Sequence, residues 1–452
     1  MQHFKPQGFF FAGDPMPFFH DGVFHLFWLL DENHHKGKNG LGGHQWAHSS
    51  SRDLIHWEQH PLALAIDEEW EGSICTGSVF HHEDTFYAFY ATRKTDWTQH
   101  LGMAVSHDGV TFQKTTPNPF ASPAPGYALR HYRDPFVFRD EQTGQFHILV
   151  TAFLENYTPK AHGGCLAHLV SSDLRTWALQ EPFFIPGYDR EPECADYFYW
   201  NGWYYLLFSN RLVTRYWMSR QPYGPWLRPT VNTFDGPAAR VMKTAAFTGN
   251  RRIGVAFLGT REGDKDNGPW QWAGNLVFRE LVQHADGALG TKLPPEMLPI
   301  ADEPLTPSFT ALTSGVVQQD TEVKLNAPES LAVGVWSGLP YNLHLRVRVT
   351  PQPGTGAFGL RLRGSGDFEQ GYDLRFLPAK QKVDLHDVSI YAVEGLDQPF
   401  TLDVVLKDDI IDVGIDGRRC LINRCPELRG EQIFLFCQHG AVTFEPVTLQ
   451  RI

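Results

Sequence analysis

The chain has 452 residues, of which 42% are hydrophobic and 20% are charged, a balance typical of soluble globular proteins. This length predicts more than one hydrophobic core. The formal net charge of −12 argues against nucleic acid and against an anionic membrane surface as partners, because both repel an acidic protein.

Signals of the cellular compartment are few. No apolar stretch approaches the length of a transmembrane span. The segment from Met1 to Gly13 has no sustained apolar run after a basic start, so it is not typical of a secretory signal. The cysteines show no CxxC spacing, which favours reduced thiols over a disulfide framework or a metal site. We therefore expect a cytoplasmic protein.

An aromatic-rich unit begins with Gly13-Asp14-Pro15 and continues as two short strands joined by a tight turn. The unit returns with a leading acid at Arg133-Asp134-Pro135 and at Glu193-Cys194. Two further copies, at residues 79–89 and 247–257, have no leading acid. The spacing of roughly 60 residues lies in the range of radial or solenoid repetition.

A second element follows most of these hairpins: a strand, a polar turn and an aromatic residue that packs back. It lies at residues 48–57, 104–112, 169–177 and 218–226. Each unit thus supplies about four short strands, the content of one propeller blade. Alternation with a period of two favours strands, and no long stretch has a helical period. Residues 1–300 are predicted to form a five-bladed β-propeller that carries the catalytic site.

A proline-rich shift in composition at residues 293–307 predicts a domain boundary. Beyond it, apolar and polar residues alternate regularly, as at residues 343–349 and 372–376. Many strands without a helical stretch predict a β-sandwich over residues 301–452. The expected fold class is all-β, with a five-bladed β-propeller followed by a C-terminal β-sandwich.

The three leading acids, Asp14, Asp134 and Glu193, are the candidate catalytic residues. A repeat around one axis places equivalent positions at one mouth of the central channel, so we expect these carboxylates to converge. Glycoside hydrolysis needs one protonated and one ionised carboxyl group across the scissile bond. A third carboxylate can hold sugar hydroxyls and raise the pKa of the acid by like-charge repulsion.

These motifs resemble glycoside hydrolase family 32, the β-fructofuranosidases, which include invertases, levanases and inulinases. Arg133-Asp134-Pro135 resembles the family's RDP motif, and Glu193-Cys194 resembles its EC motif. Other stretches similar to the family are Trp46-Ala47-His48, Asp53-Leu54-Ile55-His56-Trp57-Glu58, Pro61-Leu62-Ala63-Leu64, Thr76-Gly77-Ser78, Asp196-Tyr197-Phe198 and Arg279-Glu280-Leu281. The resemblance spans nearly the whole chain and includes a C-terminal β-sandwich.

The resemblance implies a retaining hydrolase that acts on a carbohydrate, with a β-fructofuranoside as the family's default substrate. Asp14 would be the nucleophile, Glu193 the general acid and then base, and Asp134 the stabiliser of the transition state. No metal and no organic cofactor is expected. Neighbouring histidine pairs also lack a recognised zinc spacing.

The chain departs from the family at the first motif, which usually is Asn-Asp-Pro-Asn-Gly and here is Gly13-Asp14-Pro15-Met16-Pro17. Leu29 stands where the family has a glutamine, and an insertion begins at Asp31. The residues expected to contact the transferred sugar therefore differ from those of the family. The residues expected to bind sugar in their place are Arg133, His44, Gln45, Trp46, Thr76 and Arg93.

Several alternatives stay open at this point. The chain could be an inverting propeller hydrolase similar to the family 43 arabinofuranosidases and xylosidases. It could transfer fructosyl groups or cleave difructose anhydrides, since the motifs would be the same. It could also be a propeller that binds glycans without catalysis, although the three intact acids argue against that. The sequence does not predict the oligomeric state.

Overall fold

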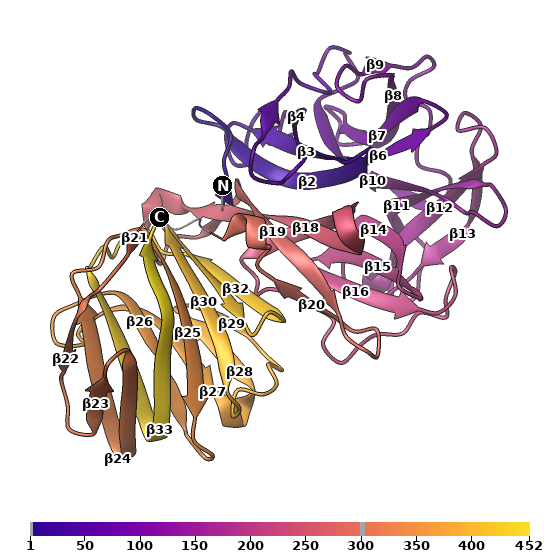
Figure 1. Cartoon of the computed structure of the whole chain (residues 1–452). Coiled ribbons are helices and arrows are strands. Elements are labelled where there is room, and N and C mark those ends of the chain that lie inside the picture. The colour runs from indigo at the N-terminus through magenta and orange to yellow at the C-terminus, as the bar shows by residue number, and fades with distance from the viewer. Residues whose placement is uncertain (1–2, 299–302) are drawn as a thin grey trace.

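The computed structural model describes residues 3–298 and 303–452 and is built from strands, with a ring of antiparallel sheets beside a second strand-rich body (Figure 1). The ring is a five-bladed β-propeller, as the repeat predicted. Blade I contains β2 (Phe11–His20), β3 (Val23–Asp31), β4 (Gln45–Ser51) and β5 (Glu58–Gln59). Blade II contains β6 (Ser73–His82), β7 (Thr85–Arg93), β8 (Gln99–Ser106) and β9 (Gln113–Lys114).

The remaining blades follow in chain order. Blade III contains β10 (Tyr127–Arg139), β11 (Phe146–Leu154), β12 (Gly164–Ser171) and β13 (Ala178–Phe184). Blade IV contains β14 (Glu193–Trp200), β15 (Trp203–Asn210) and β16 (Val213–Ser219), and single bridges from β16 to Leu227 and Thr233 extend it. Blade V contains β17 (Ala239–Phe247), β18 (Arg251–Arg261), β19 (Trp270–Gln283) and β20 (Leu289–Lys292).

The two ends of the propeller are joined by backbone pairing. β1 (His3–Phe4) adds to the last blade, where His3 pairs with Val277 of β19. Gly274 of the same strand pairs with Ala12 of β2. The N-terminal segment therefore contributes to both the first and the last blade, which closes the ring without leaving a free edge there.

The second body is a β-sandwich in which the long strand β33 (Gln432–Arg451) pairs with β24, β25 and β26. The residues Leu343, Leu345, Val347 and Val349 of β25 are buried, as their alternation predicted. Its other strands are β21 (Glu303–Pro304), β22 (Ser308–Ala311), β23 (Val316–Gln319), β24 (Glu322–Ser337), β25 (Leu343–Pro351), β26 (Ala357–Ser365), β27 (Gln370–Leu377), β28 (Lys382–Leu385), β29 (Val388–Ile390), β30 (Phe400–Lys407), β31 (Ile410–Ile415) and β32 (Arg419–Arg424).

Helices are limited to short 3₁₀ turns: η1 (Lys160–His162), η2 (Thr248–Asn250), η3 (Glu262–Asp264), η4 (Pro295–Met297) and η5 (Pro378–Lys380). Within residues 3–298 and 303–452, none of the helices has the length and apolar character needed to cross a membrane. The boundary predicted after residue 300 falls among residues 299–302, which lie outside the described residues.

Propeller and sandwich share one hydrophobic core, which includes Leu281 and Leu289 of blade V together with Leu345 and Leu421 of the sandwich. Arg279 of β19 crosses this interface. Its guanidinium pairs with Asp235 and donates to Asp412 Oδ1 of β31 at 2.7 Å. Although burial opposes ionisation, Arg279 holds the pKa of Asp412 below its ordinary value. The two bodies are therefore joined by a buried ion pair inside a continuous apolar layer.

Replacing Arg279 by leucine should destabilise the protein strongly, because two buried carboxylates lose their counter-charge. Breaking a buried pair from one side costs about 3–5 kcal/mol. The measurement is the midpoint of denaturant unfolding. Arg348→Leu is the matched control, since that side chain is 58% exposed and 3.9 Å from Glu445, and it should change stability by less than about 1 kcal/mol. Equal midpoints for both variants would contradict this account.

Candidate active site

The same irregularity occurs in the innermost strand of all five blades. In each, two residues face one residue of the neighbouring strand, as at residues 13–14 opposite Leu29 of β3. The other four bulges lie at residues 75–76, 134–135, 194–195 and 241–242. A bulge re-aims side chains that a regular strand would send to alternate faces. The five bulges therefore surround one mouth of the channel.

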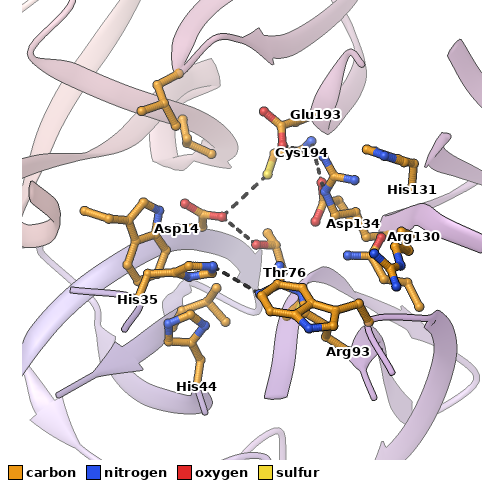
Figure 2. Close-up of a pocket in the computed structure, with 18 of the residues that line it drawn as sticks. Asp14, His35, His44, Thr76, Arg93, Arg130, His131, Asp134, Glu193 and Cys194 are labelled. Carbon is orange, nitrogen blue, oxygen red and sulfur yellow. Dashed lines mark hydrogen bonds and ion pairs between the residues drawn. The ribbon is translucent and has the colours of Figure 1, made fainter. Parts of the chain in front are cut away.

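The three predicted acids meet at this mouth. Asp14, Asp134 and Glu193 line one cavity of about 660 Å³, and all three are seen together in Figure 2. The repeat suggested equivalent positions for the three acids, but the structure places them at staggered positions. Relative to the last paired residue before the bulge, Glu193 is that residue, Asp134 is one further on, and Asp14 is two further on. Asp14 and Asp134 are unpaired bulge residues, whereas Glu193 precedes its bulge and pairs with Ser209.

Asp14 has one engaged and one free oxygen. Thr76 Oγ1 donates to Asp14 Oδ2 at 2.7 Å, and Cys194 Sγ lies 3.7 Å from the same oxygen. Oδ1 is buried without a hydrogen-bond partner among the described residues. Burial raises the pKa of Asp14 to about 7, and the charges of Asp134 and Glu193 act in the same direction, whereas the bond from Thr76 opposes them. The arrangement fixes the carboxyl group and leaves one oxygen available for chemistry.

Asp134 is held from two sides and is only 3% exposed. Thr151 Oγ1 donates to Asp134 Oδ2 at 3.1 Å, and the backbone N–H of Cys194 donates to the same oxygen at 3.2 Å. Asp134 has a positive φ of 55°, in the left-handed region that non-glycine residues seldom adopt. The strained backbone and its hydrogen bonds thus tie the acid of blade III to the bulge of blade IV.

Arg133 supplies the cation shared by the carboxylates. Its Nη2 donates to Glu193 Oε1 at 2.5 Å, and its Nε lies 3.6 Å from Asp134 Oδ2. The neighbouring carboxylates, with Glu193 first, keep the pKa of Arg133 above its ordinary value although burial opposes this. A permanently charged planar donor beside two acids can hold either a carboxylate or a sugar hydroxyl.

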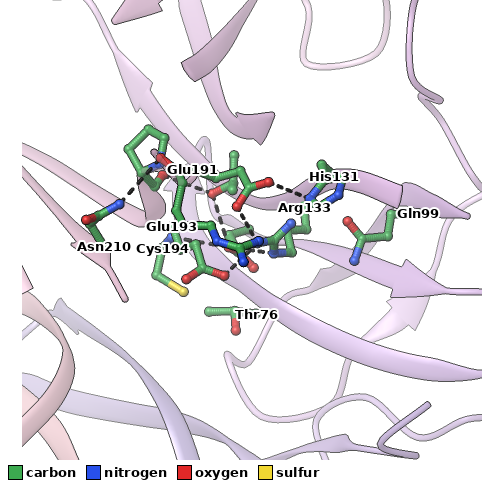
Figure 3. A network of polar contacts seen from close by, with 12 residues as sticks. Thr76, Gln99, His131, Arg133, Glu191, Glu193, Cys194 and Asn210 are labelled. Atoms are coloured by element: carbon green, nitrogen blue, oxygen red, sulfur yellow. Dashed lines mark hydrogen bonds and ion pairs between the residues drawn. The ribbon is translucent and has the colours of Figure 1, made fainter. Parts of the chain in front are cut away.

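A fourth carboxylate, which the sequence did not single out, completes this network (Figure 3). Glu191 is 5% exposed, and its Oε1 lies 2.5 Å from His131 Nδ1 while its Oε2 lies 3.9 Å from Arg133 Nη2. Burial opposes ionisation, but the bond with His131 and the charge of Arg133 lower the pKa of Glu191 to about 2. Glu191 stays ionised, so Arg133 keeps a partner when Glu193 takes up a proton. The only sequence signal was its place two residues before the EC motif.

The residues predicted to bind sugar divide into two groups. His44, Thr76, Arg93 and Arg133 line the cavity. Gln45 and Trp46 do not, which corrects the prediction that placed them there. Gln45 Oε1 accepts from the backbone N–H of Ile66 at 2.9 Å, so that side chain fixes a loop. Trp46 is fully buried in the core between blades I and II, where its indole N–H donates to the carbonyl of Cys75 at 2.8 Å.

Trp272 of β19 explains why the first motif begins with glycine. The indole lies against Gly13, and any side chain at that position would collide with its ring. Trp272 also lines the cavity together with Leu29, the residue found in place of the family's glutamine. No feature of the repeat pointed to Trp272, because it belongs to the third strand of blade V rather than to an innermost strand.

A propeller that brings three carboxylates and an arginine to one mouth defines a propeller-type glycoside hydrolase. The family model for glycosyl hydrolases family 32, N-terminal domain, matches residues 3–289. The chain therefore belongs to glycosyl hydrolase family 32, and this confirms the resemblance of its RDP and EC motifs.

Relatives of known name agree with this assignment. A levanase from Bacillus sp. strain L7 is 25% identical over 71% of this chain, and the match spans only 37% of that levanase. A levanbiose-producing levanase from Bacillus subtilis is 22% identical over 97% of this chain and 88% of its own length. The solved structure of a variant of fructan 1-exohydrolase IIa from Cichorium intybus, in complex with 1-kestose, superimposes with a TM-score of 0.79 at 16% identity, over 100% of this chain and 97% of that one.

Asp14→Asn should stabilise the protein at pH 8 more than at pH 5. A folded-state pKa raised to about 7 means that the folded form binds a proton more tightly than the unfolded form. The carboxyl group therefore favours folding at low pH, and this contribution is lost as the pH rises through about 7. The gain from the neutral amide should reach a few degrees in Tm at pH 8 and shrink toward pH 4.

The matched control is Asp367→Asn, which replaces an exposed carboxylate in the sandwich. Its effect on the melting temperature should be small and equal at both pH values. The prediction would be contradicted if Asp14→Asn melted below the wild type at pH 8. It would also be contradicted if the substitution changed the melting temperature by the same amount at both pH values, because ionisation of Asp14 would then not destabilise the fold.

Proposed function

We propose that the chain is a retaining exo-acting β-fructofuranosidase that cleaves a terminal furanoside by double displacement. The observation that carries this is the carboxyl group of Asp14, which lines a cavity shared with Glu193. Its Oδ2 is held by Thr76, while its Oδ1 has no hydrogen-bond partner among the described residues. A nucleophile needs one fixed orientation and one unengaged oxygen. A channel-mouth acid with only a structural role would have both oxygens satisfied.

In the first step, Asp14 Oδ1 attacks the anomeric carbon as the bond to the leaving group breaks, and Glu193 gives its proton to the departing oxygen. The product is a furanosyl ester of Asp14. In the second step, Glu193 takes a proton from water, the water oxygen attacks the same carbon, and the Asp14 carboxylate departs. Two inversions give net retention, and one water molecule is consumed.

Asp134 and Arg133 bind the sugar, and neither forms a bond to the anomeric carbon or gives a proton to the leaving group. Asp134 is buried, and its Oδ2 is fixed by Thr151 and by the N–H of Cys194. Its carboxylate is placed to accept from ring hydroxyls and to stabilise the positive charge that develops at the anomeric centre. Arg133 alternates between Glu193 and the sugar hydroxyls, which it can do because Glu191 holds it in place.

Fructose is the sugar that the relatives' names favour, since levanases and a fructan exohydrolase are among them. One observation favours a second furanose, such as arabinofuranose. Gly13, Leu29 and Trp272 make the wall beside Asp14 more apolar than the family's amide-rich motif would, so fewer hydroxyls can be bound there.

The first test is sugar release by purified protein from sucrose, inulin, levan oligosaccharides and aryl arabinofuranosides. Fructose should be released by the wild type, and Asp14→Ala should lower turnover by at least about a thousandfold. The melting curve of that variant should remain cooperative, because Asp14 contributes little packing. Release of arabinose alone would replace fructose by another furanose. No release from any of these substrates would mean that the altered cavity binds another sugar, and the β-fructofuranosidase proposal would fall.

A second test separates Glu193 from the other acids. Glu193→Ala should reduce turnover of natural fructosides far more than that of activated aryl glycosides, because only a poor leaving group depends on protonation. The first-formed anomer, followed by NMR, should retain the configuration of the substrate. Equal losses for both kinds of leaving group would count against Glu193 as the general acid, and an inverted anomer would contradict the retaining mechanism.

A further inference from the structure

The general acid of the proposed mechanism lies against an arginine, and this contact opposes its role. Arg133 Nη2 donates to Glu193 Oε1 at 2.5 Å, and the Arg133 side chain is only 13% exposed. An adjacent arginine keeps a carboxyl group ionised, because it stabilises the charged form. Glu193 must instead carry a proton when the leaving group departs. Proton uptake therefore requires a group that weakens the hold of Arg133 on Glu193.

Glu191 is placed to weaken that hold. Its Oε2 lies 3.9 Å from Arg133 Nη2, the same nitrogen that donates to Glu193. Figure 3 shows both carboxylates beside this guanidinium. Although burial favours the neutral form, the bond with His131 and the charge of Arg133 lower the pKa of Glu191 to about 2, so this carboxylate is ionised. One guanidinium nitrogen is thus shared by two carboxylates.

His131 keeps Glu191 from taking Arg133 completely. The imidazole Nδ1 lies 2.5 Å from Glu191 Oε1, so one oxygen of the carboxylate is engaged with His131 and only the other reaches the guanidinium. At 3.9 Å that second contact is an ion pair without a hydrogen bond. Glu191 therefore reduces the hold of Arg133 on Glu193 without abolishing it.

The backbone that carries Glu191 is fixed on both sides. Asn210 Nδ2 donates to the carbonyl of Arg190 at 3.4 Å, and Thr151 Oγ1 donates to the carbonyl of Pro192 at 3.3 Å. Both bonds use backbone oxygens of this segment. A substitution of the Glu191 side chain should therefore leave the path of the chain in place.

The other acids around Glu193 leave the shared nitrogen to the two glutamates. Asp134 draws on Arg133 through Nε, at 3.6 Å. Among the described residues, Glu191 and Glu193 are the carboxylates within ion-pair distance of Nη2. The ionisable groups around Glu193 are, besides Arg133, Glu191 and His131, Asp14 of β2, Asp134 of β10, Cys194 of β14 and Lys243 of β17.

We propose that Glu191, held by His131, is a positioning residue that draws Arg133 partly away from Glu193 and so allows Glu193 to be protonated near neutral pH. The inference rests on the proposed function, since it concerns how the general acid of that mechanism is kept ready. Glu191 does not line the cavity, so it acts through Arg133 rather than on the sugar. Without this competing carboxylate, Arg133 would pair with Glu193 alone and favour its ionised form.

The test is the pH at which Glu193 takes up a proton, followed by ¹³C NMR of protein labelled at the glutamate carboxyl carbons. Glu193→Gln removes one resonance and so identifies it. In Glu191→Gln, Arg133 turns wholly to Glu193, and the pH of proton uptake should fall by about one unit. Glu181→Gln is the matched control, because it replaces an exposed glutamate of blade III outside the cavity, and it should leave the value unchanged.

His131→Ala should shift the same value in the opposite direction. Glu191 can then turn both oxygens to Arg133, so Glu193 should take up its proton at a higher pH than in the wild type. The His131 side chain is 39% exposed, so this variant should fold, and it carries the test if Glu191→Gln does not. A Glu191→Gln value equal to or above that of the wild type, or a His131→Ala value equal to or below it, would overturn the proposal.

The pH profile of turnover is the second readout. Proton donation fails above the pH at which Glu193 is ionised, so the upper limb of kcat/KM for natural fructosides should move to lower pH in Glu191→Gln. A purely structural role would lower kcat/KM at every pH and leave the limb in place, and that result would count against a positioning role.

The NMR titration requires no turnover, so its outcome is separate from that of the sugar-release assay. If no fructoside is hydrolysed but the two variants shift proton uptake in opposite directions, the positioning role of Glu191 stands and the β-fructofuranosidase proposal falls. If fructosides are hydrolysed and neither variant shifts proton uptake, the proposed function stands and the positioning role falls.

Discussion

The bulge in the innermost strand of each blade is the constraint on which the candidate site depends. A regular strand sends successive side chains to opposite faces, so a residue next to one that lines the channel would point into a blade. The extra residue interrupts this alternation and frees a backbone N–H. In blade IV that N–H belongs to Cys194 and donates to Asp134. The positive φ angles of Asp134, Cys194 and Val241 show that three of the five bulges adopt the same left-handed conformation, which tertiary contacts must stabilise.

The blades were predictable from the sequence because each copy of the repeat forms its own hairpins, and hairpins depend on local alternation and turn residues. The convergence of Asp14, Asp134 and Glu193 followed from the same repeat. Their stagger did not, because it depends on which residue of each strand pairs last before the bulge. His44 and Trp46 show a similar limit. They are two residues apart in the sequence, yet one lines the cavity and the other fills the core between two blades.

The catalytic carboxylates differ in how much positive charge lies beside them, and the difference matches the roles proposed for them. Arg133 lies among Asp134, Glu191 and Glu193 and offsets part of the negative charge on the side of the cavity where a proton must be exchanged. Asp14 has no cation within ion-pair distance among the described residues and is held by a hydroxyl and a thiol instead. Its carboxylate is therefore less stabilised than its neighbours, which suits a group that must bond to carbon and later leave. Glu191 was missed because its role depends on contacts with His131 and Arg133 from blade III.

The residues that depart from the family motif contact one another in the structure. Trp272 occupies the space that a side chain at position 13 would fill, so the tryptophan in β19 requires glycine there. The insertion closes around the same indole: the His44 ring lies 4.6 Å from it, and His34 Nδ1 lies 2.9 Å from its backbone carbonyl. Asp31 holds both histidines. Restoring an amide at position 13 alone would meet the indole ring. The segment from Asp31 to His44 that packs against Trp272 also anchors Arg93 through His35.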